Sequence, residues 1–296
     1  MKIIQILGPS YAGSTALGYA LNTVDGYLFG SELRRILPAT RKQLQQRPSC
    51  DLCGKECEYW SDDLYDRLNS INPCSLDNIY SLFAEMHPVV EALVDDSKSL
   101  DATKNTHAEF RILTVKHPIR LLASAIYNDR KKLNINHDSF EAAGSMLEES
   151  LQRTTEITEA KLTKYLNTYT NFFESFDDLY IFKNDTAHHN DFEAFRGLEE
   201  ELSLASKSIK ATQFAETPCH SIGGNRAPFW IAQKAQLGKK TTNPRAAYYE
   251  DAISYGDWRI DNKYKTIFSE NLIDRLLDSK VYKDLSVLLG YKPDEI

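Results

Sequence analysis

Residues 2–21 read KIIQILGPSYAGSTALGYAL, and this stretch decides the fold. The apolar run Lys2–Leu7 predicts a buried strand, and it leads directly into the glycine loop Gly8–Thr15. Apolar residues at helical spacing follow in 14–22 and predict a helix. A strand, a glycine loop and a helix in this order form the context that a phosphate-binding loop requires, because backbone N–H groups and the helix N-terminus then point at one anion.

The loop departs from the nucleotide-hydrolase pattern at one position. Gly8 and Gly13 keep the spacing of that pattern, but Ser14 stands where it places lysine. Lysine and magnesium offset the charge of a triphosphate, whereas a less charged anion can be held by backbone and hydroxyl donors without a metal. We therefore predict an anion site formed by Ser10, Tyr11, Ala12, Gly13, Ser14 and Thr15. The alternative is that the glycines only shape a tight turn.

Further short apolar runs predict buried strands at Val89–Val94, Arg111–Val115 and Leu179–Phe182. Helical spacing of apolar residues recurs in 118–131, 145–175 and 264–289. Strands that alternate with helices indicate a parallel sheet. The predicted fold is therefore α/β, a P-loop-type parallel sheet flanked by helices, in a single domain over 1–296.

A second candidate anion site follows the strand Arg111–Val115. Ligands of open α/β sheets bind at the carboxyl ends of the strands, and Lys116 stands at such an end. Ser124, in the helix that follows, is placed to hold the same anionic group. The simpler alternative leaves both side chains in solvent.

Composition excludes several classes of partner. The chain has 296 residues and a formal net charge of −7, which argues against nucleic acid or anionic lipid as a partner, because both need a basic face. No segment approaches the roughly 18 apolar residues of a membrane helix. The N-terminus lacks the pattern of a signal peptide, so we expect a cytoplasmic protein with its five cysteines reduced. The sequence leaves the oligomeric state open.

Several short segments keep the order that they have in one known family. Besides the first loop, they are Gly30-Ser31-Glu32-Leu33, Asp95-Asp96-Ser97-Lys98, Lys116 with Ser124 eight residues later, and His220–Arg226. In this order the chain resembles the sulfotransferases that use 3′-phosphoadenosine 5′-phosphosulfate (PAPS), in particular their bacterial branch and the related glycan and tyrosyl-protein sulfotransferases. The resemblance covers most of the chain.

The resemblance implies an activity and a role for each segment. It implies transfer of a sulfuryl group from PAPS to a hydroxyl or amine of a small molecule or glycan, with no metal. The first loop would hold the 5′-phosphosulfate, and Lys116 and Ser124 the 3′-phosphate. A loop around 216–246 would cover the cofactor through Asn225 and Arg226. Glu32 would be the catalytic base, its pKa raised by partial burial, and Lys98 would stabilise the sulfuryl and bridging oxygens.

The chain also departs from the family pattern. Tyr11 replaces a basic residue of the first loop, and Lys116 replaces an arginine. Lys98 is the candidate for the missing loop cation. If Glu32 instead points to water, His107 and His117 are the alternative bases.

Cys50, Cys53 and Cys57, with Cys74 further on, have spacing that is common among zinc ligands. The family has a similar cysteine-rich segment before an aromatic residue, here Tyr59-Trp60. We predict that this segment packs under the acceptor loop without a metal, and zinc remains the alternative.

Two other functions remain open. A P-loop kinase of nucleotides or small molecules would need a magnesium-binding aspartate after a buried strand, which Asp95 or Asp96 could supply, but it also needs the absent loop lysine. A non-catalytic protein with the PAPS-binding fold is the other possibility, and Tyr11 is the feature that favours it.

Overall fold

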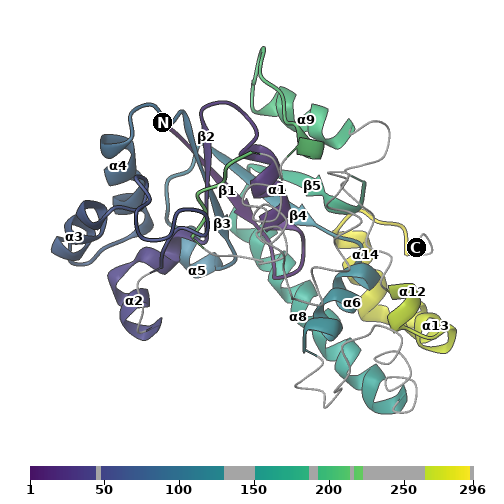
Figure 1. Cartoon of the computed structure of the whole chain (residues 1–296). Helices are drawn as coiled ribbons and strands as arrows, with labels where there is room; N and C mark the ends of the chain where they lie inside the picture. The colour runs from purple at the N-terminus through teal and green to yellow at the C-terminus, as the bar shows by residue number, and fades with distance from the viewer. Residues whose placement is uncertain (45–47, 130–150, 187–192, 214–216, 223–263, 294–296) are drawn as a thin grey trace.

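The described strands form one five-stranded parallel sheet in the order β2-β3-β1-β4-β5. The structure is a computed structural model, and it describes residues 1–44, 48–129, 151–186, 193–213, 217–222 and 264–293. The strands are β1 (Lys2–Leu7), β2 (Tyr27–Ser31), β3 (Ala92–Ser97), β4 (Phe110–Val115) and β5 (Leu179–Lys183). Helices flank this sheet, so the predicted α/β class is confirmed (Figure 1).

The helices cover both faces of the sheet. The helices in the amino-terminal part of the chain are α1 (Ser14–Leu21), η1 (Leu33–Ile36), α2 (Pro38–Leu44), α3 (Asp62–Ser70), α4 (Leu76–Met86) and α5 (Leu100–Thr103). Further along lie α6 (Pro118–Asp129), α8 (Leu151–Ser175), η2 (Asn184–Thr186), α9 (Glu193–Glu201) and η3 (Ala211–Gln213). The chain then forms α12 (Tyr264–Ile267), α13 (Glu270–Asp278) and α14 (Lys280–Leu288).

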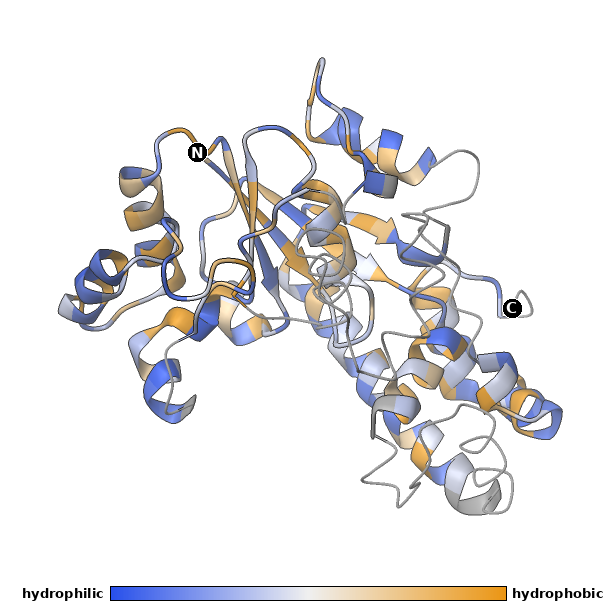
Figure 2. Cartoon of the chain, viewed as in Figure 1, coloured by the Kyte–Doolittle hydropathy of each residue, from blue (hydrophilic) through white to orange (hydrophobic). Residues whose placement is uncertain are grey.

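Alternation along the strands divides the core between the two faces. In β1, β3, β4 and β5 the even-numbered residues, such as Ile4 and Val94, pack with α1 and α9, and in β2 the odd-numbered Phe29 does so. The alternate residues face the other way, where Ile3 packs with α3 and α4 and Leu113 packs with α6, α8, α13 and α14. Figure 2 shows apolar residues gathered on the central strands and hydrophilic residues on much of the outlying helices. The strands are therefore covered on both sides, as an all-parallel sheet requires.

The predicted strands correspond to the observed ones with two differences. The strand expected at Val89–Val94 lies at Ala92–Ser97, because Val89 is 81 % exposed in the turn before it and the acidic pair that ends it is buried. The strand Tyr27–Ser31 was not predicted. The segment 264–289, expected as one helix, contains three short ones.

Part of the expected architecture lies outside the described residues. Of the loop around 216–246 the structure describes 217–222, and both Asn225 and Arg226 fall beyond it. Among the described helices none is long and apolar enough to cross a bilayer.

The packing of α1 on the sheet depends on a glycine. A Cβ atom at Gly18 would lie 2.2 Å from the ring of Phe29 in β2, whereas a Cβ atom at Gly197 in α9 would meet only the Tyr180 hydroxyl at 3.1 Å. Only the first contact is a clash inside a packed core.

We predict that Gly18→Ala lowers the free energy of unfolding by roughly 1–3 kcal/mol, because the added methyl group must displace α1 or the Phe29 ring. Gly197→Ala is the matched control, a helical glycine whose near neighbour is the end of the Tyr180 side chain, which can shift, and it should change stability by less than about 1 kcal/mol. Urea unfolding followed by circular dichroism measures both. Equal losses for the two variants would contradict the packing of α1 against β2.

Candidate functional site

The glycine loop after β1 turns sharply through three residues with positive φ angles. These are Gly8 (φ 141°), Tyr11 (φ 76°) and Gly13 (φ 98°). Gly13 is the N-cap of α1, so no side chain of the cap residue covers the first N–H groups of the helix. Such N–H groups can bind an anion, and the anion site stays a prediction.

The same glycines are also required by their neighbours. A Cβ atom at Gly8 would lie 2.7 Å from Thr114 Oγ1, and one at Gly13 would lie 2.5 Å from the Asn184 side chain. The tight-turn interpretation therefore accounts for both glycines without a ligand. In the predicted anion-binding set, Ala12, Ser14 and Thr15 are buried, Ser10 is exposed, and Tyr11 packs against the cluster around α6 and α8.

A chain of polar contacts joins the loop to the ends of β2 and β3. Thr15 Oγ1 donates to Asp96 Oδ2 over 2.8 Å, and Lys98 Nζ lies 3.4 Å from the same oxygen. Lys98 Nζ also donates to Glu32 Oε1 over 2.6 Å. Glu32 and Lys98, the two residues predicted to be catalytic, are thus in direct contact with each other. Asp96 connects Lys98 to Thr15 of the glycine loop.

The position of Glu32 is set by an irregularity at the end of β2. The register with β3 shifts between Phe29 and Ser31, and Ser31 has a φ of 66°. Such a bulge bends the strand and redirects the following side chain. A Cβ atom at Gly30 would lie 2.6 Å from Leu33, so this bend needs glycine. Glu32 then caps η1 beside the end of β3.

The buried carboxylate of Asp95 holds this bend in place. Asp95 Oδ1 accepts a hydrogen bond from the Leu33 backbone N–H (3.0 Å). Asp95 Oδ2 accepts from the hydroxyls of Tyr80 (2.8 Å) and Ser97 (2.7 Å). Burial raises the pKa of Asp95 to about 6, although these donors act in the opposite direction.

The electrostatics of the Glu32–Lys98 pair differ from the expectation. Burial favours the neutral form of Glu32, but Lys98 and Arg35 outweigh it, so the pKa of Glu32 is lowered. Burial likewise opposes the charge on Lys98, and Asp96 and Glu32 more than compensate, so the pKa of Lys98 is raised. The expectation that partial burial raises the pKa of Glu32 is therefore wrong for this arrangement, in which an ion pair holds the carboxylate.

The second predicted site also brings its residues together. Lys116 Nζ donates to Ser124 Oγ over 3.2 Å, and both residues are buried. The alternative that leaves them in solvent is therefore wrong. Lys98 and Lys116 follow β3 and β4, the two strands on either side of β1. Strand spacing separates these two positions by roughly 10 Å, with the glycine loop between them.

The alternative histidine bases lie elsewhere. His107 precedes β4, at the amino edge of the sheet, where its side chain is 81 % exposed and lies 3.7 Å from Glu109. His117 is buried against the rings of Tyr282 and Tyr291. His107 contacts Glu109 and His117 packs against two tyrosine rings, whereas Glu32 contacts Lys98, so Glu32 remains the candidate base.

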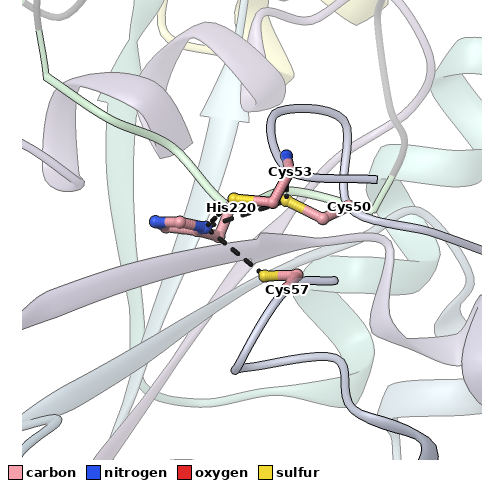
Figure 3. A group of neighbouring side chains, drawn as sticks. All are labelled: Cys50, Cys53, Cys57 and His220. Carbon is pink, nitrogen blue, oxygen red and sulfur yellow. Dashed lines mark hydrogen bonds between the residues drawn. The ribbon is translucent and has the colours of Figure 1, made fainter. Parts of the chain in front are cut away.

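A second polar cluster combines distant parts of the sequence. Cys50, Cys53, Cys57 and His220 present ligand atoms that all lie within 4.8 Å of one another (Figure 3). The fourth member is His220, not Cys74, whose sulfur instead contacts the Ser75 carbonyl. Sequence spacing could not reveal this partner, because 163 residues separate it from Cys57.

Comparison of this chain with protein-family models finds no match, and comparison with curated proteins finds none either. A function is therefore argued from the residues of the site. The strongest observations are the Thr15–Asp96–Lys98–Glu32 contacts and the Lys116–Ser124 pair.

The raised pKa of Asp95 predicts a specific pH dependence of stability. The folded state binds this proton more tightly than the unfolded state, whose pKa is near the ordinary value of 3.8. Stability from this group is thus fully present below about pH 4 and is lost as the pH rises to about 6. The loss amounts to roughly 3 kcal/mol.

We predict that Asp95→Asn removes this dependence, so that the variant gains stability relative to the parent protein between pH 4 and pH 7. Thermal unfolding across that range measures the gain, and any hydrogen bond lost in the variant gives an offset that is independent of pH. Asp66→Asn, at an exposed position of α3, should show no such gain. Parallel curves for Asp95→Asn and the parent protein would contradict the prediction.

Proposed function

We propose that this protein is a sulfotransferase that moves the sulfuryl group of PAPS to a hydroxyl or amine acceptor. The observation that carries the proposal is the Lys98 ammonium, held between Glu32 and Asp96 next to the hydroxyl of Thr15. A fixed cation beside a loop of backbone donors suits a reaction that depends on positioning and on stabilisation of charge. The sheet and loop then act as a P-loop-type scaffold.

In this mechanism the acceptor oxygen or nitrogen attacks sulfur, and the bond from sulfur to the bridging oxygen breaks. The sulfuryl group passes to the acceptor, and adenosine 3′,5′-bisphosphate leaves. Glu32 takes the acceptor proton, and Lys98 donates a hydrogen bond to the oxygen on which charge develops. Transfer of the Lys98 hydrogen bond from Glu32 to that oxygen would also weaken the ion pair that lowers the pKa of Glu32. The carboxylate then becomes a stronger base when it is needed.

Two ammonium groups, the buried Lys116 and the partly buried Lys98, suit the two anionic ends of this nucleotide. Lys98 would serve the 5′-phosphosulfate with Ser14, Thr15 and the loop backbone, while Lys116 and Ser124 would serve the 3′-phosphate. The side-chain cations supply charge that a metal would otherwise provide, so the proposal needs none. The acceptor class is a small molecule or a glycan, and the glycan rests on the family resemblance.

One observation favours a second candidate, a P-loop phosphotransferase. Thr15 and Asp96 are in the relation that holds magnesium in nucleotide kinases, a loop hydroxyl beside a carboxylate at the end of a strand. Within the described part of the chain, Asp96 Oδ1 is buried without a hydrogen-bond partner. An unpaired carboxylate oxygen suits a cation, although the Lys98 ammonium already lies 3.4 Å from the other oxygen.

Calorimetry with adenosine 3′,5′-bisphosphate, and separately with ATP and magnesium, distinguishes the two candidates. The sulfotransferase should bind the bisphosphate in the presence of a chelator and bind ATP weakly with or without magnesium. Tight binding of ATP that requires magnesium would favour the phosphotransferase. Transfer of labelled sulfate to a panel of acceptors then tests turnover, and bisphosphate binding without transfer would indicate a binding protein.

We predict that Glu32→Gln lowers the sulfate transfer rate by about 10² to 10⁴ while the affinity for adenosine 3′,5′-bisphosphate stays within about threefold. Lys98→Ala should lower the rate by roughly 10² to 10³, because the developing charge loses its donor. The measurement is single-turnover transfer of labelled sulfate.

The controls carry the same substitutions at exposed ion pairs. Glu85→Gln breaks the contact with Arg67, and Lys207→Ala breaks the contact with Glu91. Both should leave transfer unchanged. A normal rate for Glu32→Gln would remove this carboxylate as the base.

We also predict that Lys116→Ala weakens binding of PAPS by about 10- to 100-fold more than binding of adenosine 5′-phosphosulfate, because only PAPS carries a 3′-phosphate. Titration calorimetry on both nucleotides gives the ratio. Lys183→Ala, at the end of the next strand, should leave the ratio unchanged. Equal losses for the two nucleotides would place Lys116 elsewhere in the site.

A further inference from the structure

The three thiols and the imidazole near β2 have the geometry of a tetrahedral ligand set. His220 Nδ1 lies 3.8 Å from Cys50 Sγ, 3.3 Å from Cys53 Sγ and 3.4 Å from Cys57 Sγ. Zinc bonds of about 2.3 Å to sulfur and 2.0–2.1 Å to nitrogen place tetrahedral sulfur and nitrogen ligands about 3.5 Å apart. The observed distances fall around this value, and all ligand atoms lie within 4.8 Å of one another.

On the cysteine side of the cluster, Cys50 and Cys53 lie in a short hairpin and Cys57 follows it. The backbone groups of Cys50 and Gly54 exchange hydrogen bonds of 3.1 and 3.0 Å. Gly54 has a φ of 71°, which a tight turn requires, and a Cβ atom there would meet nothing within 4 Å. The backbone N–H of Cys53 donates to Cys50 Sγ over 3.4 Å. A thiolate that ligates a metal is stabilised by such a donor.

On the histidine side of the cluster, the backbone is held by contacts of Ser221 and of the His220 carbonyl. The Ser221 hydroxyl donates to Asp51 Oδ2 (3.0 Å), and the Asp51 N–H donates to the Ser221 carbonyl (2.8 Å). The indole of Trp60 donates to the His220 carbonyl. Two segments distant in sequence are therefore joined around the imidazole, and Figure 3 shows its Nδ1 directed at the sulfurs.

We propose that Cys50, Cys53, Cys57 and His220 bind one zinc ion as a structural Cys₃His site. Four protein ligands fill the tetrahedron and leave no position for a substrate, which is typical of structural zinc. Binding displaces the thiol protons to solvent and leaves a site with one net negative charge. The metal fastens residues 217–222 to the cysteine hairpin, and Ile222 in turn donates its N–H to the Gly30 carbonyl (3.3 Å) beside Glu32. This site stands whether or not the protein transfers sulfate.

The first test measures zinc per chain by elemental analysis in protein purified from zinc-containing medium without chelator. We expect one zinc per chain in the parent protein and in Cys74→Ser, a cysteine outside the cluster. Cys53→Ser should lose the metal, with affinity reduced by more than about 100-fold in competition with a chromophoric chelator. Because Cys53 is exposed, this substitution opens no core cavity, and circular dichroism verifies that the variant is folded.

The second test replaces zinc with cobalt, whose absorption reports tetrahedral geometry and sulfur ligation. The parent protein should show a sulfur-to-cobalt charge-transfer band, and His220→Cys should retain cobalt with a stronger band because it offers a fourth sulfur. A folded parent protein without stoichiometric zinc and without a cobalt spectrum would overturn the proposal. A Cys53→Ser variant that keeps its metal, or a disulfide between two of these cysteines in purified parent protein, would also overturn it.

Discussion

The site depends on the burial of two adjacent carboxylates, Asp95 and Asp96, at the end of β3, the strand beside the central strand β1. Neighbouring residues of a strand point to opposite faces, so Asp95 faces Tyr80 of α4 and Asp96 faces Thr15 of α1. A buried carboxylate is tolerated only when donors or cations compensate it. The elements on both faces must therefore bring polar groups to this point: a phenol, two hydroxyls, a backbone N–H and the Lys98 ammonium.

The two carboxylates meet this requirement differently. Burial raises the pKa of Asp95 to about 6, because its neutral donors only partly offset the cost of burying the charge. For Asp96 the neighbouring cation is Lys98, whose own pKa is raised by Asp96 and Glu32 despite burial. Asp95, with its neutral donors, fixes the turn at Leu33, whereas Asp96 fixes the position of the Lys98 ammonium. This division places the fixed cation on the glycine-loop side of β3.

Sequence patterns could predict the elements whose signals are local. The strand Lys2–Leu7, the loop after it and helix α1 lie within 20 residues, and their apolar spacing gives the observed boundaries. The strand Tyr27–Ser31 was not predicted, because it is short and ends in Gly30-Ser31. These residues favour turns, and here they form a bulge. The carboxyl end of β3 was not predicted, because acidic residues are expected at the surface unless the groups that donate hydrogen bonds to them are known.

The same reasoning explains which site residues could be predicted. Glu32, Lys98, Lys116 and Ser124 follow predicted or family-like segments, and the fold brings each pair into contact. The ion pair that lowers the pKa of Glu32 could not be predicted, because it depends on a distance between two strand ends. His220 could not be assigned to the cysteine cluster, since a contact across 163 residues leaves no trace in local spacing.

Glu32 sits in a turn that is held from two independent directions. Asp95 fixes the residue after it through the Leu33 N–H, and Ile222 fixes the residue two before it through the Gly30 carbonyl. Ser31, between these anchors, has a positive φ, a conformation that costs energy unless its surroundings determine it. The first anchor belongs to the sheet core and the second to the segment that carries His220. The direction of the Glu32 side chain is thus determined by the acid pair of β3 together with the cysteine–histidine cluster, so these two polar clusters act on the same turn.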